Sequence, residues 1–174
     1  ECRKAFVSEF TPIFQSLYLS LCDNDVEKVS IQYASHISRG ELKEQLTSFR
    51  TKERIVGYTL HGVHRDDLEL YLNEYPIRQE GSQGQTKTYF IALKLAQFLY
   101  LKERGNQLTP LLLLDDIFDK LDAGRVARII NYVSGNAFGQ IFITDTNREH
   151  LDSILAMTTK DYKLFHVSNG EIKE

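Results

Sequence analysis

The sequence predicts an α/β protein whose second half contains a mainly parallel sheet. From residue 111 onward, short apolar runs typical of strands alternate with segments of helical periodicity, as expected where helices connect parallel strands. One of these runs, residues 111–114, consists of four leucines and is followed at once by two aspartates. Polar residues in that position are typical of the carboxyl edge of a parallel sheet, where α/β proteins bind their ligands.

Length and composition predict a globular protein that needs neither a metal site nor disulfide bonds for its stability. The chain has 174 residues, of which 42% are hydrophobic, enough for one or two buried cores. Cys2 and Cys22 lack the spacing of a disulfide framework or a zinc site, so we expect a reducing, cytoplasmic location. No apolar run approaches the roughly 18 to 20 residues of a membrane helix, and we expect no membrane partner.

The first residues and the net charge bear on whether the chain is part of a longer protein and whether it binds nucleic acid. The opening Glu-Cys-Arg-Lys contains no initiator Met and no signal-peptide pattern, so we expect the chain to begin inside a longer protein. The formal net charge of -3 gives no overall electrostatic preference for nucleic acid. If DNA is a partner, a local basic patch must bind it.

The N-terminal third is predicted to contain two helices and one strand. Apolar residues recur at helical spacing over residues 3–21, and alternating apolar and polar residues predict a strand within residues 26–34. Residues 38–54 mix charges with apolar residues at helical spacing, and Ser38 with Glu41 has the pattern of a capping box. We expect this second helix to lie on the surface.

The middle of the chain is predicted to hold a hairpin and a long buried helix. Residues 56–60 and 68–72 have the composition of strands, and the polar segment at residues 62–67 is expected to join them. The helix predicted over residues 83–104 is apolar on most of its faces, which indicates burial.

The last third alternates strands with helices. After the strand at residues 111–114, a helix is predicted from its apolar residues at helical spacing: Val126, Ile129, Ile130 and Val133. A second apolar strand is expected at residues 140–144. A third, at residues 162–167, leads to the turn pair Asn169-Gly170.

The adjacent carboxylates Asp115 and Asp116 are candidates for metal-nucleotide chemistry. Mg²⁺ keeps several waters and takes one or two carboxylates together with phosphate oxygens, so Asp115 is the candidate metal-side residue. Asp116 is then placed to orient or deprotonate the attacking water, a role worth about 10² to 10⁴ in rate. The alternative interpretation is a pair of acids that merely ends a strand on a solvated loop.

A short polar segment, Gly81-Ser82-Gln83-Gly84-Gln85, immediately precedes the long apolar helix. Ser82 is placed to cap that helix, with Gln85 at the third position of a capping box. The cap does not explain Gly84, because glycine inside a helix costs about 1 kcal/mol relative to alanine. Glycine is tolerated more readily there if another backbone or a phosphate must approach closely. Helix amino termini and serine hydroxyls together can bind anions.

In combination these segments resemble the ABC-type ATPases. The segment around Ser82 is similar to the ABC signature sequence, which is Leu-Ser-Gly-Gly-Gln in transporters. The apolar strand ending at Asp115 is similar to the Walker B strand, and Leu121-Asp122 is similar to the D-loop. Asp122 is also expected to cap the helix that follows it. The series in this order is far more specific than any one of its parts.

Within that superfamily the chain resembles the RecF family of bacterial recombination and repair proteins. Residues 62–67 read Gly-Val-His-Arg-Asp-Asp, where the family pattern is Gly-Pro-His-Arg-Asp-Asp followed by a similar Ser-x-Gly-Gln. The resemblance covers most of residues 56–174 and departs from the family at Val63. It implies the C-terminal part of an ABC/SMC-type, P-loop-like ATPase. Residues 1–81 would hold part of a helical lobe and a hairpin, and residues 82–174 the signature, Walker B strand and D-loop.

The resemblance implies a protein that binds ATP, Mg²⁺ and DNA, with ATP held between the two subunits of a dimer and hydrolysed slowly. Asp115 would reach Mg²⁺ through water. Ser82, Gly84 and Gln85 would contact the γ-phosphate bound by the opposite subunit. RecF-like proteins act with RecO and RecR to help load RecA at single-strand gaps beside duplex DNA, in DNA replication, recombination, repair and the SOS response.

The resemblance also bears on two segments with weaker patterns of their own. Residues 144–146 lie where transporters carry a switch histidine, and they contain no histidine. Sensing of the γ-phosphate would therefore use a hydroxyl or a carboxylate, with Thr144 as the candidate, or be absent. For the turn His64-Arg65-Asp66-Asp67, the sequence alone favours a polar turn with the histidine and arginine in solvent. The resemblance implies a functional role there, with nucleotide, DNA and a partner protein as the alternatives.

The phosphate-binding loop G-x-x-x-x-G-K-S/T does not occur in this sequence. In the family that loop lies near the N-terminus. We therefore expect this chain alone neither to bind ATP tightly nor to hydrolyse it, and to hold no cofactor by itself, although the parent protein resembles a slow ATPase.

Three other interpretations remain open. A transporter ATPase subunit is disfavoured by the missing switch histidine, by Gln83 and by the His-Arg-Asp-Asp turn. An SMC-type chromosome protein needs long heptad coiled coils, which residues 1–55 do not supply. The third is a DNA- or partner-binding module without catalysis, because residues 39–54 carry a mild basic excess, which a solvated helical face also explains.

Overall fold

The computed structural model describes residues 1–22, 27–105, 108–157 and 161–173. The chain forms two compact units, Glu1–Leu108 and Thr109–Glu174. Packing therefore keeps the long helix that begins at Gln83 with the first unit. The boundary that the motifs predict between residues 81 and 82 divides the chain by function rather than by packing, and it remains a prediction.

The first unit is built on two long helices that pack together, α1 (Cys2–Leu21) and α4 (Gln83–Arg104). Both helices lie where the apolar periodicity predicts them. Their core includes the fully buried rings of Phe14, Tyr18 and Tyr89, and the ring centroids of Phe14 and Tyr89 lie 4.8 Å apart. None of the helices in the described part of the chain is long and apolar enough to cross a membrane.

An antiparallel ladder lies beside α1. Its strands are β1 (Val29–Ala34) and β2 (Asp67–Leu72), paired along their full length from Val29 opposite Leu72 to Ala34 opposite Asp67. The chain then forms the short strand β3 (Tyr75–Pro76), which pairs with β2, and the single-turn helix α3 (Ile77–Glu80). These elements lead directly to the start of α4.

Residues 56–60 do not form the predicted strand. The strand β2 therefore pairs with a partner other than the predicted one. The helix α2 (Leu42–Val56) continues through Val56 and ends at Gly57, whose φ of 80° lies in the left-handed region that favours glycine. The partner of β2 is β1, far earlier in the sequence. A run of five residues is too short for periodicity to separate a strand from the end of a helix.

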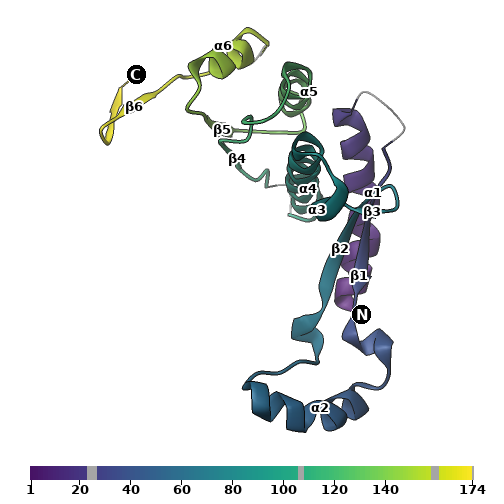
Figure 1. Ribbon diagram of the computed structural model, residues 1–174. Coiled ribbons are helices and arrows are strands. Elements are labelled where there is room, and N and C mark those ends of the chain that lie inside the picture. The colour runs from purple at the N-terminus through teal and green to yellow at the C-terminus, as the bar shows by residue number, and fades with distance from the viewer. Residues whose placement is uncertain (23–26, 106–107, 158–160, 174) are drawn as a thin grey trace. The chain divides into compact units, whose positions relative to one another are not determined.

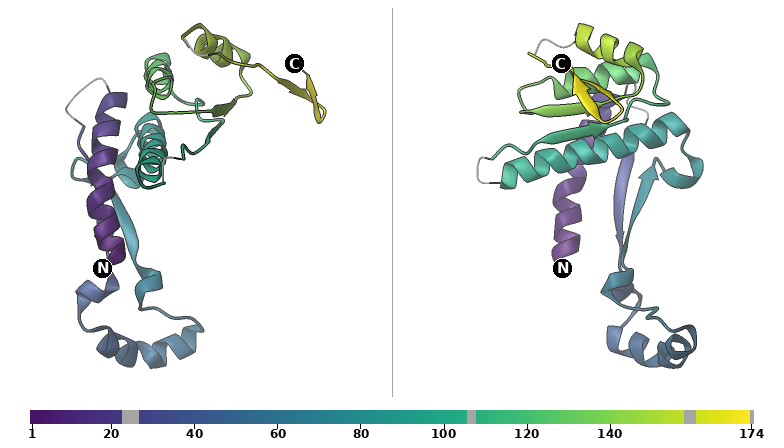
Figure 2. Two further views of the ribbon diagram at one scale, coloured as in Figure 1. Left: turned by 180° about the vertical axis from the view of Figure 1, so that it is seen from behind. Right: turned by 90° about the vertical axis from the view of Figure 1, so that its left-hand side faces the viewer.

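The ladder carries α2 at its end. Figure 1 shows α2 and the short helices η1 (His36–Arg39) and η2 (Val63–Arg65) beyond the strands, away from α4, and the second view in Figure 2 agrees. We call residues 35–66 the distal lobe. No residue of α2 is buried, which confirms the prediction of a surface helix.

The capping box predicted for Ser38 and Glu41 is wrong. Ser35 is the capping residue, because its hydroxyl oxygen accepts a hydrogen bond from the Ile37 N–H at the start of η1. The Ser38 hydroxyl donates to the Ser35 carbonyl oxygen at 2.6 Å. Glu41 precedes α2 without a side-chain cap bond.

The second unit contains a pair of parallel strands, as predicted. β4 (Leu112–Asp115) and β5 (Ile141–Thr144) are in register from Leu112 opposite Ile141 to Asp115 opposite Thr144. Between them in sequence is α5 (Ala123–Val133), which packs against α6 (Arg148–Met157). Figure 2 shows both helices on one side of the strands.

The β4–β5 pair has one covered face and one open face. Leu112 and Leu114 are buried, whereas Leu113 and Phe142 are 69% and 48% exposed. Parallel sheets are normally covered on both faces, which is why their strands are apolar throughout. The open face is therefore a surface suited to being covered by further structure.

The chain ends in an antiparallel hairpin of β6 (His166–Ser168) and β7 (Glu171–Lys173). Asn169 and Gly170 join the strands with φ angles of 51° and 81°, the left-handed conformations that a two-residue hairpin turn requires. The predicted turn pair is confirmed, while the strand before it is shorter than predicted.

The packing of α1 against α4 predicts unequal effects for two leucines of α1. Leu17 is 1% exposed and Leu19 is 45% exposed. Replacing Leu17 with alanine should lower the free energy of unfolding by about 2 to 5 kcal/mol, because it leaves a cavity. Replacing Leu19 should cost no more than about 1 kcal/mol. Urea unfolding of both variants measures this, and equal losses would contradict the packing.

Candidate functional site

The structure brings three predicted site residues together at the ends of two parallel strands. β4 ends at Asp115, which lies opposite Thr144 at the end of β5. The Thr144 hydroxyl donates a hydrogen bond to Asp115 Oδ1, and the Asp116 N–H donates to the Thr144 carbonyl oxygen at 3.1 Å. Thr144, the candidate switch, is therefore bonded to both members of the acidic pair.

The chemistry of this corner suits a magnesium-bound phosphate. Carboxylate and hydroxyl oxygens are the donor type that Mg²⁺ prefers, and Asp115 and Thr144 supply both. Asp115 and Asp116 are exposed. Asp116 has a φ of 47°, a left-handed conformation that turns the chain out of the strand and is uncommon for residues other than glycine. The metal-side role of Asp115 and the catalytic role of Asp116 remain predictions.

Asp122 caps α5, as the sequence predicts. Its carboxylate accepts a hydrogen bond from the Arg125 N–H at 2.9 Å, and Arg125 Nε lies 3.5 Å from its second oxygen. The backbone bond from Arg125 is the main reason why the pKa of Asp122 is lower than usual. A negative charge at a helix N-terminus is also favoured by the helix dipole. Its role as a D-loop residue remains a prediction.

The segment at the start of α4 forms the predicted capping box. The Ser82 hydroxyl oxygen accepts from the Gln85 N–H at 3.2 Å, and Gln85 Oε1 accepts from the Ser82 N–H at 2.9 Å. Ser82 is exposed, while Gly84 and Gln85 are half-buried in the first turn. We call Ser82, Gly84 and Gln85 the signature corner. An exposed helix N-terminus with a serine hydroxyl can bind an anion.

A further bond of Gln85 was not predicted. Gln85 Nε2 donates to Glu27 Oε1 at 2.7 Å, and Glu27 Oε2 accepts from the Tyr18 hydroxyl at 2.6 Å. Burial and the bond to Glu27 raise the pKa of the Tyr18 hydroxyl. Glu27 is 58 residues from Gln85, so no local pattern in the sequence could indicate it.

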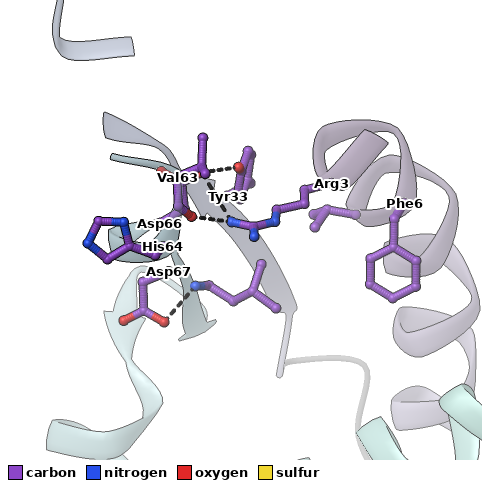
Figure 3. Close-up of a pocket in the computed structure, with 9 residues that line it drawn as sticks. Arg3, Phe6, Tyr33, Val63, His64, Asp66 and Asp67 are labelled. Atoms are coloured by element: carbon purple, nitrogen blue, oxygen red, sulfur yellow. Dashed lines mark hydrogen bonds and ion pairs between the residues drawn. The ribbon is translucent and has the colours of Figure 1, made fainter. Parts of the chain in front are cut away.

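Asp66 is the buried member of the His-Arg-Asp-Asp turn. Its side chain is 1% exposed, and its carboxylate accepts hydrogen bonds from the Tyr33 hydroxyl, the Ser35 hydroxyl and the His36 N–H, with Arg3 Nη1 at 3.4 Å. The Tyr33 bond is the largest of the effects that lower the pKa of Asp66. Figure 3 shows Arg3 and Tyr33 converging on this carboxylate. Asp66 therefore joins α1 to the base of the distal lobe.

The other three residues of the turn lie near the surface. His64 and Asp67 are exposed and line a pocket of about 400 Å³ beside Asp66, and His64 points away from Arg3 (Figure 3). Arg65 Nε donates to the Thr59 carbonyl oxygen at 2.8 Å. The turn therefore holds its histidine at the surface, as the sequence favours, but uses its first aspartate to hold the structure together.

Comparison with curated proteins identifies relatives along the whole chain. The DNA replication and repair protein RecF of Phocaeicola vulgatus is 56% identical over 172 residues, which are 99% of this chain and 46% of the relative. RecF of Parabacteroides distasonis is 56% identical over 173 residues, and RecF of Porphyromonas gingivalis is 51% identical over 171 residues. The chain belongs to the RecF family. It spans about half the length of the curated relatives it matches. No protein-family model matches it.

Solved structures agree with the RecF assignment. The recombination mediator protein RecF-ATPrS of the RecFOR pathway matches with a TM-score of 0.72 and 26% identity over 98% of this chain and 45% of that chain. RecF-ATP of the same pathway has a TM-score of 0.70 and 24% identity. An SMC ATPase structure shares the fold, with a TM-score of 0.55 and 16% identity. The predicted fold class and the predicted resemblance to RecF are confirmed.

Val63 occupies the position where the RecF pattern has proline. Its carbonyl oxygen accepts a hydrogen bond from Arg3 Nη1. Valine and proline both supply a backbone carbonyl, so the departure from the RecF pattern keeps the acceptor that this contact uses.

The bonds around Asp66 predict a specific loss of stability in Asp66→Asn. Asparagine turns an NH₂ group toward hydroxyl, N–H and guanidinium donors, so the variant should unfold at a lower urea concentration than the wild type. Asp67→Asn is the matched control, because Asp67 is exposed and accepts only a local bond from the Leu68 N–H in the described structure.

The pH dependence of this loss follows from the lowered pKa of Asp66. A depressed folded-state pKa contributes stability that is complete above the unfolded pKa of about 3.9 and disappears as the pH falls through the folded value. The difference between wild type and Asp66→Asn should therefore shrink in acid. A difference that stays constant as the solution is acidified would contradict the role of the charged carboxylate.

Proposed function

We propose that this chain is the C-terminal part of an ATP-dependent DNA-binding protein of the RecF type, which acts in DNA replication and recombinational repair. The identity of 56% along 99% of the chain carries the proposal. The exposure of Ser82 and of the acidic pair supports it, because a nucleotide and a second subunit must reach both.

In this proposal the acidic pair serves ATP hydrolysis. Asp115, through a water, and Thr144 would hold the magnesium-bound phosphate. Asp116 orients and deprotonates the attacking water. Magnesium supplies charge neutralisation for the phosphate oxygens when it is bound. Asp122 contributes as a D-loop residue while it caps α5.

The signature corner serves the opposite subunit of a dimer. Ser82 offers its hydroxyl, and the first turn of α4 offers N–H groups at the positive end of the helix dipole, where a γ-phosphate is stabilised. Gly84 permits close approach of that phosphate. Formation of the dimer then depends on ATP, so this corner acts as a switch between monomer and dimer.

The open face of the β4–β5 pair is where further parts of the ATPase lobe are proposed to pack. Leu113 and Phe142 present apolar side chains there, although sheets of this type are buried on both faces. The curated relatives are about twice as long as the matched region. We propose that the remaining half supplies the elements that cover this face and the phosphate-binding loop that this sequence lacks.

The proposed partners follow the family. They are DNA at junctions of single strands and duplex, RecO- and RecR-like proteins, and RecA, whose loading the protein promotes in a cytoplasmic setting. The solved relatives support this choice, because they are named as recombination mediators of the RecFOR pathway.

The assignment of Asp116 is tested in the full-length protein. Asp116→Asn should lower ATP turnover by about 10² to 10⁴, because the water loses its base, and should leave ATP-dependent dimerisation intact. Asp119→Asn is the matched control, since Asp119 is a nearby exposed carboxylate. Steady-state turnover and sedimentation with ATP measure the two properties. Equal turnover in the two variants would contradict the assignment. Saturable turnover by the present chain alone would instead contradict the expectation that this chain does not hydrolyse ATP by itself.

The surface charge of the distal lobe favours α2 as the contact to DNA. Lys43, Arg50 and Arg54 are exposed and fall within about 40° of one another around the helix, at intervals of about 10 and 6 Å. The structure records no ion pair for these three side chains among the residues it describes. We call them the basic stripe.

Two of the acids in the distal lobe bind groups outside the stripe. Glu53 Oε1 accepts hydrogen bonds from the Leu60 and His61 N–H groups at 2.7 and 3.2 Å, and the buried Asp66 side chain accepts from the Tyr33 hydroxyl. The three basic side chains of the stripe are therefore left facing solvent. Phosphate contacts of this kind position DNA without reading its sequence.

The basic stripe predicts a change in the salt dependence of DNA binding by the full-length protein. Each lost phosphate contact reduces the slope of log K against log salt by about 0.9, so Arg50→Glu should flatten it by roughly that amount. Lys52→Glu is the matched control, because Lys52 lies on another side of α2. Fluorescence anisotropy with gapped duplex DNA measures both slopes, and equal slopes in the two variants would contradict a contact at the stripe.

A further inference from the structure

We propose that Glu27 is a positioning residue for the signature corner, which it fixes by setting the orientation of the Gln85 side-chain amide. The inference rests on the proposed function, since it names a residue outside the signature that controls how Ser82 meets the phosphate of the opposite subunit. Glu27 precedes β1 and belongs to none of the motifs in the sequence.

The two ends of the Gln85 amide are chemically different, and Glu27 selects which end faces Ser82. A carboxylate only accepts hydrogen bonds, so the amide must turn its NH₂ group toward Glu27. Gln85 Nε2 does so, at 2.7 Å from Glu27 Oε1. The carbonyl end, Oε1, is then left facing the Ser82 N–H at 2.9 Å, where an acceptor is needed.

Glu27 is itself held in place. Its other oxygen accepts a hydrogen bond from the Tyr18 hydroxyl at 2.6 Å, and Cys22 Sγ lies 3.8 Å from the same oxygen. Tyr18 has no exposed surface, so its ring cannot move without disturbing the core between α1 and α4. The series of hydrogen bonds from Tyr18 through Glu27 and Gln85 to Ser82 thus fastens the signature corner to the core.

This arrangement also determines which hydrogen bonds the Ser82 hydroxyl can make. Its oxygen accepts from the Gln85 N–H, and the described structure gives its proton no acceptor. That proton is therefore available to an incoming phosphate oxygen. Without Glu27 the amide can rotate and place NH₂ against the Ser82 N–H, two donors facing each other, which opens the capping box and the first turn.

Four variants of the full-length protein separate positioning from general stability. Glu27→Ala removes the acceptor, whereas Glu27→Gln keeps one carbonyl oxygen for Gln85 and should restore the wild-type behaviour. Tyr18→Phe removes the anchoring hydroxyl but leaves the bond between Glu27 and Gln85. Glu69→Ala is the matched control, because Glu69 also accepts from a tyrosine hydroxyl, that of Tyr71 at 3.0 Å, but lies on β2.

The direct readout is hydrogen exchange of the Ser82 and Gln85 N–H groups in the protein without nucleotide. Both groups are held by the capping box, so Glu27→Ala should speed their exchange by about five- to tenfold, the loss expected for one hydrogen bond. Glu27→Gln and Glu69→Ala should stay within about twofold of wild type, and Tyr18→Phe should change exchange less than Glu27→Ala does. Unchanged exchange in Glu27→Ala, or an equal change in Tyr18→Phe, overturns the proposal.

The second readout is ATP-dependent dimerisation. Glu27→Ala should weaken the dimer by about tenfold while ATP binding by the monomer is unchanged, because the corner acts only on the opposite subunit's nucleotide. Faster exchange in Glu27→Ala with a dimer as tight as the wild type overturns the proposal. If the wild type does not dimerise with ATP, the proposed function fails, and the exchange result still decides whether Glu27 orients Gln85.

Discussion

The hydrogen bonds of the Gln85 side chain hold the start of α4 in place and tie it to the core of the first unit. A helix N-terminus at the surface frays unless its N–H groups are satisfied, and Gln85 satisfies that of Ser82 while it is tied to Glu27. Tyr18 connects this pair to the core. The signature corner is consequently a defined surface, suited to meeting a phosphate with little further ordering.

In the second unit, a side-chain hydrogen bond likewise fixes the acidic pair, Asp115 and Asp116, but at the ends of strands. Parallel pairing of β4 with β5 places Thr144 opposite Asp115, and the hydroxyl bond between them fixes the carboxylate at the strand end. The left-handed conformation at Asp116 then carries the next carboxylate out of the strand. We propose that each of these two places offers part of a nucleotide site, and that the complete site requires the rest of a RecF-type ATPase and a second subunit.

Periodicity and local motifs predicted the parts of this protein whose causes are local. The limits of α4, the caps at Ser82 and Asp122, and the parallel strands that end at Asp115 and Thr144 all follow from neighbouring residues. The pairing of β1 with β2 and the bonds of Glu27 and Asp66 join residues far apart in sequence, and no single segment records them. The wrong strand at residues 56–60 arose because a short apolar run does not reveal where a helix ends.

A structure of the full-length protein with a non-hydrolysable ATP analogue would show directly whether the signature corner meets the nucleotide of the opposite subunit. We expect a dimer in which the Ser82 hydroxyl lies about 2.5 to 3.0 Å from a γ-phosphate oxygen held by the other subunit, with Gln85 still bonded to Glu27. A dimer in which Ser82 faces solvent, remote from both nucleotides, would contradict it.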